Sequence, residues 1–118
     1  MYRTVSFYKT KDGKCPVAEF IDSQPVKVAT KIAWTLKLIQ DLEKIPKTYF
    51  KKLADTEIYE CRIEISGNIY RLLGFFHNGN LVILTNGFQK KTQKTPKNEI
   101  EICKQRMKDF LQRKGEER

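Results

Sequence analysis

The sequence predicts a small α+β domain, an antiparallel sheet flanked by helices in the order β-α-α-β-β-β-α. Two observations carry this prediction. In Tyr59–Thr95, apolar and polar side chains alternate, and two glycine-containing turns interrupt the alternation. This pattern is typical of a three-stranded meander. Apolar residues recur at steps of three and four from Pro25 to about Lys44 and from Thr95-Pro96 to about Gln112, which predicts two amphipathic helices.

The segment before the meander supplies the remaining elements. Arg3–Tyr8 is β-branched and aromatic and predicts a first strand, and Pro16 is suited to begin a short helix. Lys47–Asp55 predicts a basic connection without regular structure. Trp34 widens the apolar stripe of the long helix, so we expect it in the core rather than as a stacking platform for a base.

Length and charge limit the function classes. The 118 residues are expected to form one domain, residues 1–118. The chain has 23 Lys and Arg against 14 Asp and Glu, a net charge of +9, which favours a polyanionic partner such as nucleic acid or an acidic protein segment. The excess is concentrated near the end: residues 87–114 hold nine cations and three anions, or +6 of the +9.

No membrane-spanning or signal-peptide pattern is visible, so we expect a cytoplasmic protein without a membrane partner. The three cysteines do not form a short metal-ligand spacing, and His77 is the single histidine. We therefore expect free thiols, no metal site and no cofactor.

The turns of the meander decide which strand residues share a face. Asn78-Gly79 predicts a two-residue hairpin that pairs Arg71 with Asn86. At the first turn, Ser66-Gly67-Asn68, an even loop sorts polar from apolar residues better than an odd one and places Arg71 opposite Glu64. One face is then predicted to be half polar, with Glu60, Arg62, Glu64, Arg71 and Asn86.

The other face of the meander is predicted to be apolar and to meet the long helix. Its members are Tyr59, Cys61, Ile63, Ile65, Tyr70, Leu72, Phe76, Leu81 and Ile83, whereas Leu73, Phe75, Val82 and Leu84 are mixed into the half-polar face. Cations among apolar neighbours need a counter-charge. Either Glu60 and Glu64 form a structural ion-pair ladder with the arginines, or the arginines bind phosphate.

The motifs PVAEF, KKL, YECR, GNIYRLL, ILTNGFQKKTQKTP and EIEICKQR occur in this order and resemble the HigB-like, phage-derived host toxins of the RelE/ParE superfamily. The resemblance covers roughly residues 4–113, and GFQKKTQKTP is specific to that group. It implies a RelE-like fold with a curved antiparallel sheet and a toxin of a type II toxin–antitoxin module. Such a toxin enters the ribosomal A site, cuts mRNA as an endoribonuclease (an mRNA interferase) and is silenced by a cognate helix-turn-helix antitoxin.

The resemblance also implies roles for single residues. Arg62 in YECR and Arg71 in IYR match positions of catalytic basic residues, and we take Lys91 of the basic loop as a third. Further RNA contacts are expected from Lys90, Lys94, Asn86 and Lys52. The general base stays open between Glu60, Glu64 and a lysine whose pKa neighbouring cations lower.

The chain departs from the family pattern at two points. Asn86 stands where many relatives have the histidine of HGF, and the last helix lacks a tyrosine that some RelE toxins use near the leaving group. Two alternatives follow. The chain is a ParE-like topoisomerase poison, or it is a non-catalytic, attenuated RNA-binding domain in which Tyr49, Phe50 or Phe88 stack on bases.

Overall fold

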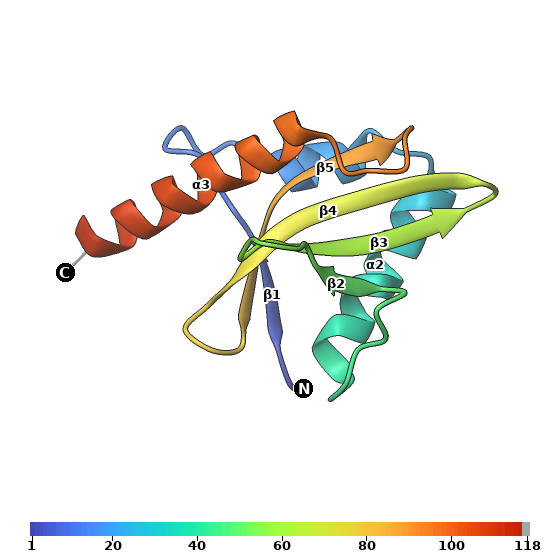
Figure 1. Ribbon diagram of the computed structural model, residues 1–118, viewed down its shortest axis with the longest axis horizontal. Coiled ribbons are helices and arrows are strands. Elements are labelled where there is room, and N and C mark those ends of the chain that lie inside the picture. The colour runs from blue at the N-terminus through green and yellow to red at the C-terminus, as the bar shows by residue number, and fades with distance from the viewer. Residues whose placement is uncertain (117–118) are drawn as a thin grey trace.

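The computed structural model describes residues 1–116, and its fold is the small α+β domain that the sequence predicts (Figure 1). The described elements are, in chain order, β1 (Thr4–Phe7), α1 (Pro16–Asp22), α2 (Val26–Asp41), β2 (Phe50–Lys52), β3 (Tyr59–Ile65), β4 (Asn68–His77), β5 (Leu81–Lys90) and α3 (Lys97–Glu116). β2 lies inside the predicted irregular connection, so that prediction is wrong for these residues.

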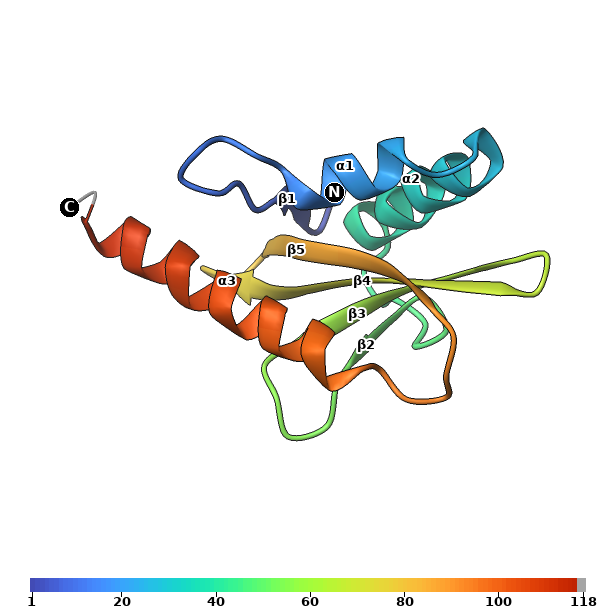
Figure 2. The ribbon, with the colours of Figure 1, turned by 90° about the horizontal axis from the view of Figure 1, so that it is seen from above.

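The strands form one open, mixed sheet in the order β1-β5-β4-β3-β2. Neighbouring strands are antiparallel except β1, which pairs in parallel with β5. α1 and α2 lie along one face of the sheet and α3 lies along the other, so the sheet is the middle layer (Figure 2). Of the helices in residues 1–116, none is long and apolar enough to cross a membrane.

The sheet face under α1 and α2 carries the main apolar core. Val28, Ile32 and Ile39 of α2 are buried there. Trp34 falls about 200° around the helix from Ile32, because each residue advances a helix by about 100°. It is 44% exposed, so the prediction of a core position for Trp34 is wrong. At Gly87 a Cβ atom would lie 2.5 Å from the Phe20 ring, so glycine permits the close packing of α1 on β5.

The first turn of the meander decides how the two predicted arginines meet. Ser66 and Gly67 both have positive φ, 51° and 79°, as the two-residue turn that matches strand twist requires. The loop has an even number of residues, as predicted, but it is two residues shorter than a pairing of Arg71 with Glu64 would require. Arg71 therefore lies opposite Arg62 rather than Glu64, and both arginines keep the predicted common face.

The second turn is one residue longer than predicted. Asn80 stays out of the ladder after Asn78-Gly79, and its carbonyl accepts a hydrogen bond from Thr4 N of β1 at 3.1 Å. His77 therefore pairs with Leu81, and the predicted pairs of this hairpin are wrong by one residue. The predicted faces are inverted for the start of β5: Val82 and Leu84 join the core under α2, whereas Leu81 and Ile83 pack on the α3 side.

A β-bulge restores the predicted faces farther along β5. The ladder skips Thr85, so Asn86 lies opposite Leu73 and Phe88 lies opposite Arg71. The predicted pairing of Arg71 with Asn86 is wrong, but both residues are on the α3 face. The bulge thus keeps the basic end of β5 beside the arginines of β3 and β4.

α3 covers only part of its sheet face. Ile100 and Cys103 pack with Ile58 and Leu73, and the helix then continues past the edge of the sheet (Figures 1 and 2). α3 begins at Lys97. The parts of β3 and β4 that carry Arg62 and Arg71 therefore lie past the N-terminal end of this helix. There the 91–96 loop borders the sheet.

Candidate functional site

Neighbouring rows of the ladder gather charged residues on the α3 face. Lys51 lies opposite Glu60, Arg62 opposite Arg71, and Glu64 opposite Ile69, which in turn pairs with Lys90. Like charges directly opposite each other destabilise a sheet. The central pair of arginines therefore needs an anion close by.

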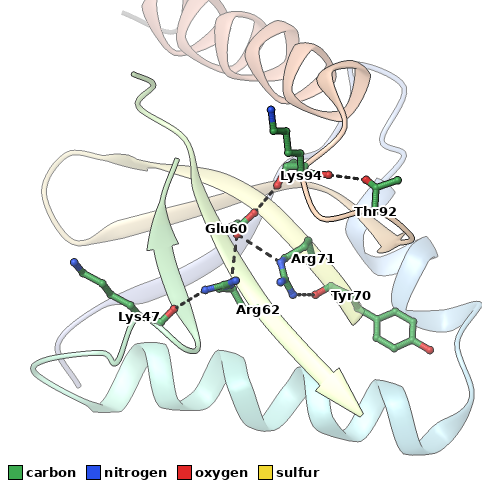
Figure 3. Close-up of polar contacts among 8 residues, drawn as sticks. Lys47, Glu60, Arg62, Tyr70, Arg71, Thr92 and Lys94 are labelled. Carbon is green, nitrogen blue, oxygen red and sulfur yellow. Dashed lines mark hydrogen bonds and ion pairs between the residues drawn. The ribbon is translucent and has the colours of Figure 1, made fainter. Parts of the chain in front are cut away.

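Glu60 supplies that anion (Figure 3). Its Oε1 lies 3.5 Å from Nε of Arg62 and 3.5 Å from Nε of Arg71, and its Oε2 accepts a hydrogen bond from the Thr95 hydroxyl at 2.9 Å. The Glu60 side chain is buried. One carboxylate is thus shared by two guanidinium groups and tied to the basic loop, so the three charges sum to +1.

Arg71 forms the floor of the site. Its side chain is 6% exposed, and its Nη1 donates to the carbonyl of Tyr70 at 3.0 Å. Within residues 1–116 its buried Nε has no hydrogen-bond partner, since the contact with Glu60 is an ion pair without hydrogen-bond geometry. Burial lowers the pKa of Arg71 and Glu60 opposes this shift, but a guanidinium stays charged at physiological pH. A nearly buried guanidinium with incomplete pairing, which also lines a surface hollow, is a candidate position for an anionic oxygen.

Two surface hollows open at this floor, and both are lined by Arg62, Glu64 and Arg71. The first hollow, about 640 Å³, extends to Lys90 and Lys91. The second hollow, about 480 Å³, extends the other way to α2 and the segment before β2. Because they share these residues, the hollows form one basic trough, which suits an extended polyanion.

The fold lowers the pKa of Lys90, which lines the first hollow. Partial burial and repulsion from Arg71 lower the pKa of Lys90, against the attraction of Glu60. A lysine with a lowered pKa is neutral in a larger fraction and can accept a proton. The structure thus brings Lys90, predicted as an RNA contact, into a position suited to proton transfer.

The other predicted residues of the basic loop and the acids lie at different depths. Lys91 is exposed and lines the first hollow. Lys94 is exposed, and its side chain points away from Glu60 (Figure 3). Glu64 is exposed on the wall of both hollows. Of the two predicted bases, Glu60 is the one already bound by two arginines and a hydroxyl.

Two predicted RNA contacts lie outside the trough. Lys52 is opposite Tyr59 in the ladder and lines a separate hollow with Phe50. Asn86 is 4% exposed, and its Nδ2 donates to the carbonyl and the carboxylate of Glu99 at 3.2 and 3.0 Å. Neither side chain lines a hollow of the trough, and the two RNA contacts stay predictions. In this chain the residue at position 86 fastens the start of α3.

Sequence reasoning missed several residues of the trough. Lys51 lines the second hollow, and strand alternation would have identified it had β2 been recognised. Lys31 and Lys47 reach the same hollow from α2 and from the segment after it, which no local pattern predicts. Thr95 was predicted only as a helix cap, whereas its hydroxyl ties the loop to Glu60.

Comparison with known families agrees with this geometry. A family model described as "Phage derived protein Gp49-like (DUF891)" matches residues 19–108, a span that includes the whole trough. The chain belongs to the Gp49-like family. This is a RelE/HigB-like family of toxins, and membership indicates a toxin-like function of the toxin–antitoxin type with an antitoxin as partner. Among curated proteins, none matches this chain.

Proposed function

We propose that this Gp49-like protein is a ribosome-dependent mRNA endoribonuclease of the HigB type, acting as one domain without a metal. The observation that carries the proposal is the shared carboxylate: Glu60 serves both Arg62 and Arg71, and Nε of Arg71 is left without a hydrogen bond. A phosphate at the floor of the trough would bring the missing negative charge to the part of Arg71 that lines both hollows.

Cleavage of RNA needs a base for the 2′-hydroxyl, stabilisation of charge on phosphorus and a proton for the departing oxygen. Arg62 and Arg71 supply the second through parallel N–H donors. Neutral Lys90 takes the proton of the 2′-hydroxyl, whose oxygen then attacks phosphorus. The bond to the 5′-oxygen breaks, leaving a 2′,3′-cyclic phosphate, and Lys91 as ammonium gives the 5′-oxygen its proton.

Glu60 acts in this proposal by positioning and not as the base. Its oxygens are engaged by Arg62, Arg71 and Thr95, so accepting a proton would release all three contacts. Glu64 is exposed to solvent and sits on the wall between the hollows. We assign Lys90 rather than either acid because it combines proximity to the arginines with a lowered pKa.

The open trough supports dependence on the ribosome. Both hollows are open to solvent and lined by lysines, whose long side chains bind phosphate as point charges without fixing the attack geometry. Aligning the 2′-oxygen with the leaving oxygen then has to come from outside the protein. mRNA held in the ribosomal A site provides that alignment.

The test is cleavage in a translating bacterial extract, with mRNA 5′ ends mapped after addition of wild-type or Arg71→Ala protein. We expect new cuts within translated codons for the wild type and none for the variant or in the absence of ribosomes. Lys104→Ala, which removes an exposed cation of α3 outside the trough, is the matched control and should cut normally. Melting curves establish that both variants are folded.

Intact mRNA together with arrested growth would contradict the nuclease. DNA damage under those conditions would support the ParE-like topoisomerase poison. Loss of RNA cleavage by Arg71→Ala with retained antitoxin binding separates the catalytic role from the partner surface.

A further inference from the structure

Tyr49 lines the second hollow, and the ring of Trp34 packs edge-to-face against it. The proposed chemistry uses neither ring. We propose that Tyr49, backed by Trp34, is a stacking platform for one unpaired base of the RNA, next to the phosphate that Arg62 and Arg71 hold. The inference rests on the proposed function, because it adds a base-binding position to that site.

The two rings are available for a ligand. Trp34 is 44% exposed on α2, and its ring centroid lies 5.6 Å from that of Tyr49 with an interplanar angle of 77°, an edge-to-face contact. In the described part of the chain, neither ring belongs to the hydrophobic clusters that hold the helices on the sheet. Large aromatic side chains outside the core, in contact with each other, are typical of binding surfaces.

Tyr49 is fixed with respect to the arginines. Its carbonyl accepts a hydrogen bond from Arg62 N at 2.8 Å, and its own N–H donates to the carbonyl of Pro46 at 2.9 Å. Tyr49 therefore lies beside Arg62 on neighbouring segments of the backbone, and Arg62 in turn pairs with Arg71. Tyr49 and both arginines line the second hollow, so a nucleotide whose phosphate lies on the arginines has its base within the same hollow.

The surrounding charges favour nucleic acid. Lys31 Nζ lies 4.7 Å from the centre of the Trp34 ring, and Lys47 and Lys51 line the hollow with it. The interaction of an exposed cation with a ring is weak, so Lys31 is free to turn to a phosphate. The volume of the second hollow, about 480 Å³, lies in the range of about 300–1,000 Å³ that is typical of small-ligand sites.

Single-stranded RNA explains both features of the hollow. Proteins that bind single strands combine a cationic groove with aromatic rings on which bases stack. An acidic segment of an antitoxin would account for the lysines but would leave the exposed ring pair without a role. We therefore assign the hollow to an unpaired base, and binding of an acidic peptide becomes an outcome of the test.

Trp34 is the single tryptophan of the chain and contacts the Tyr49 ring, so its fluorescence reports on a ligand bound at Tyr49. The probe is a 2′-O-methyl hexaadenylate, which cannot be cleaved, and the comparison probe is an abasic strand of equal length and charge. We expect the adenylate to quench Trp34 and the abasic strand to leave it unchanged. Affinity should fall about tenfold in Tyr49→Ala and in Tyr49→Leu, because stacking is worth about 1–3 kcal/mol per base.

Tyr2→Ala is the matched control, since Tyr2 is an aromatic residue, 50% exposed, outside the hollow. It should bind both probes as the wild type does. Equal binding of the two probes, sensitive to Arg71→Ala but without a change in Trp34 fluorescence, would overturn the platform and leave the phosphate site intact. Quenching by an acidic peptide but not by the adenylate would overturn it in favour of a protein partner. Cleavage in the translating extract judges the proposed function separately.

Discussion

Two charged clusters lie on the α3 side of the sheet and use the same chemistry in opposite ways. The Asp109 cluster joins Asp109 and Arg113 of α3 to Tyr8 after β1. Asp109 Oδ2 accepts hydrogen bonds from the Tyr8 hydroxyl at 2.5 Å and from Arg113 Nε at 3.1 Å, and it forms an ion pair with Arg113 Nη2 at 2.8 Å. Arg113 also donates to the carbonyl of Lys9 and lies over the Tyr8 ring.

The Glu60 cluster, made of Glu60, Arg62, Arg71 and Thr95, has one acid for two guanidinium groups. Here the ion-pair distances are 3.5 Å, and Arg71 Nε lacks a hydrogen bond. In the Asp109 cluster one acid serves one guanidinium with short contacts, which is how a structural ion pair stabilises a fold. The two clusters contain the same types of side-chain group and differ in stoichiometry and hydrogen-bond completeness, and on this difference we base the proposal that the Glu60 cluster binds phosphate.

The largest effect should come from replacing the arginine of each cluster by methionine. Arg71→Met should slow mRNA cleavage about 10²–10³-fold, as loss of a transition-state donor does. Its melting temperature should stay equal or rise, because an apolar side chain of similar volume replaces a buried charge and leaves Glu60 paired with Arg62. Cleavage rates and thermal melting measure the two effects.

Arg113→Met is the matched control, and it should behave in the opposite way. Cleavage should be unchanged, and the melting temperature should fall by about 3–6 °C because Asp109 and the Lys9 carbonyl lose their donor. The comparison between the clusters fails if Arg71→Met melts far below the wild type while it still cleaves mRNA.

A smaller loss, about 10²-fold, is expected for Lys90→Arg. Arginine keeps the positive charge but cannot become neutral, so RNA affinity should be retained while proton transfer is lost. For the wild type, the neutral base becomes more abundant as pH rises, so single-turnover cleavage should increase with pH up to the pKa of Lys90. Because that pKa is lowered, the increase should end below the pH expected for an ordinary lysine, about 10.4. A flat profile shared by both proteins would exclude Lys90 as the base.

The sequence predicted part of the Glu60 cluster, because successive side chains of a strand alternate between the two faces of the sheet. The even first hairpin put Arg62 and Arg71 on one face, and the structure confirms that face. The same argument failed in β5, where one extra loop residue inverted Val82 and Leu84. A hydrogen bond from β1 holds that residue out of the ladder, and such a long-range contact leaves no mark in the local sequence.

Other parts of the site could not be predicted from local pattern. β2 has three residues, FKK, too short for alternation to be detected. Trp34 belongs to an apolar run, and only the position of the helix on the sheet decides that it points outward. The sharing of one carboxylate by two arginines depends on side-chain conformations, which charge counting along the sequence does not contain.

The smallest effect should come from the loop contact of the Glu60 cluster. Thr95→Val removes the hydrogen bond to Glu60 Oε2 while keeping the side-chain shape. We expect a three- to tenfold loss of cleavage, which corresponds to about 0.6–1.4 kcal/mol, the net worth of a typical hydrogen bond. Since Thr95 positions the loop and the acid rather than touching RNA, kcat should fall while KM changes little. Thr95→Ser retains the hydroxyl and should restore the rate. Equal rates in all three proteins would mean that the arginines hold their geometry without the loop, and that Glu60 alone positions them.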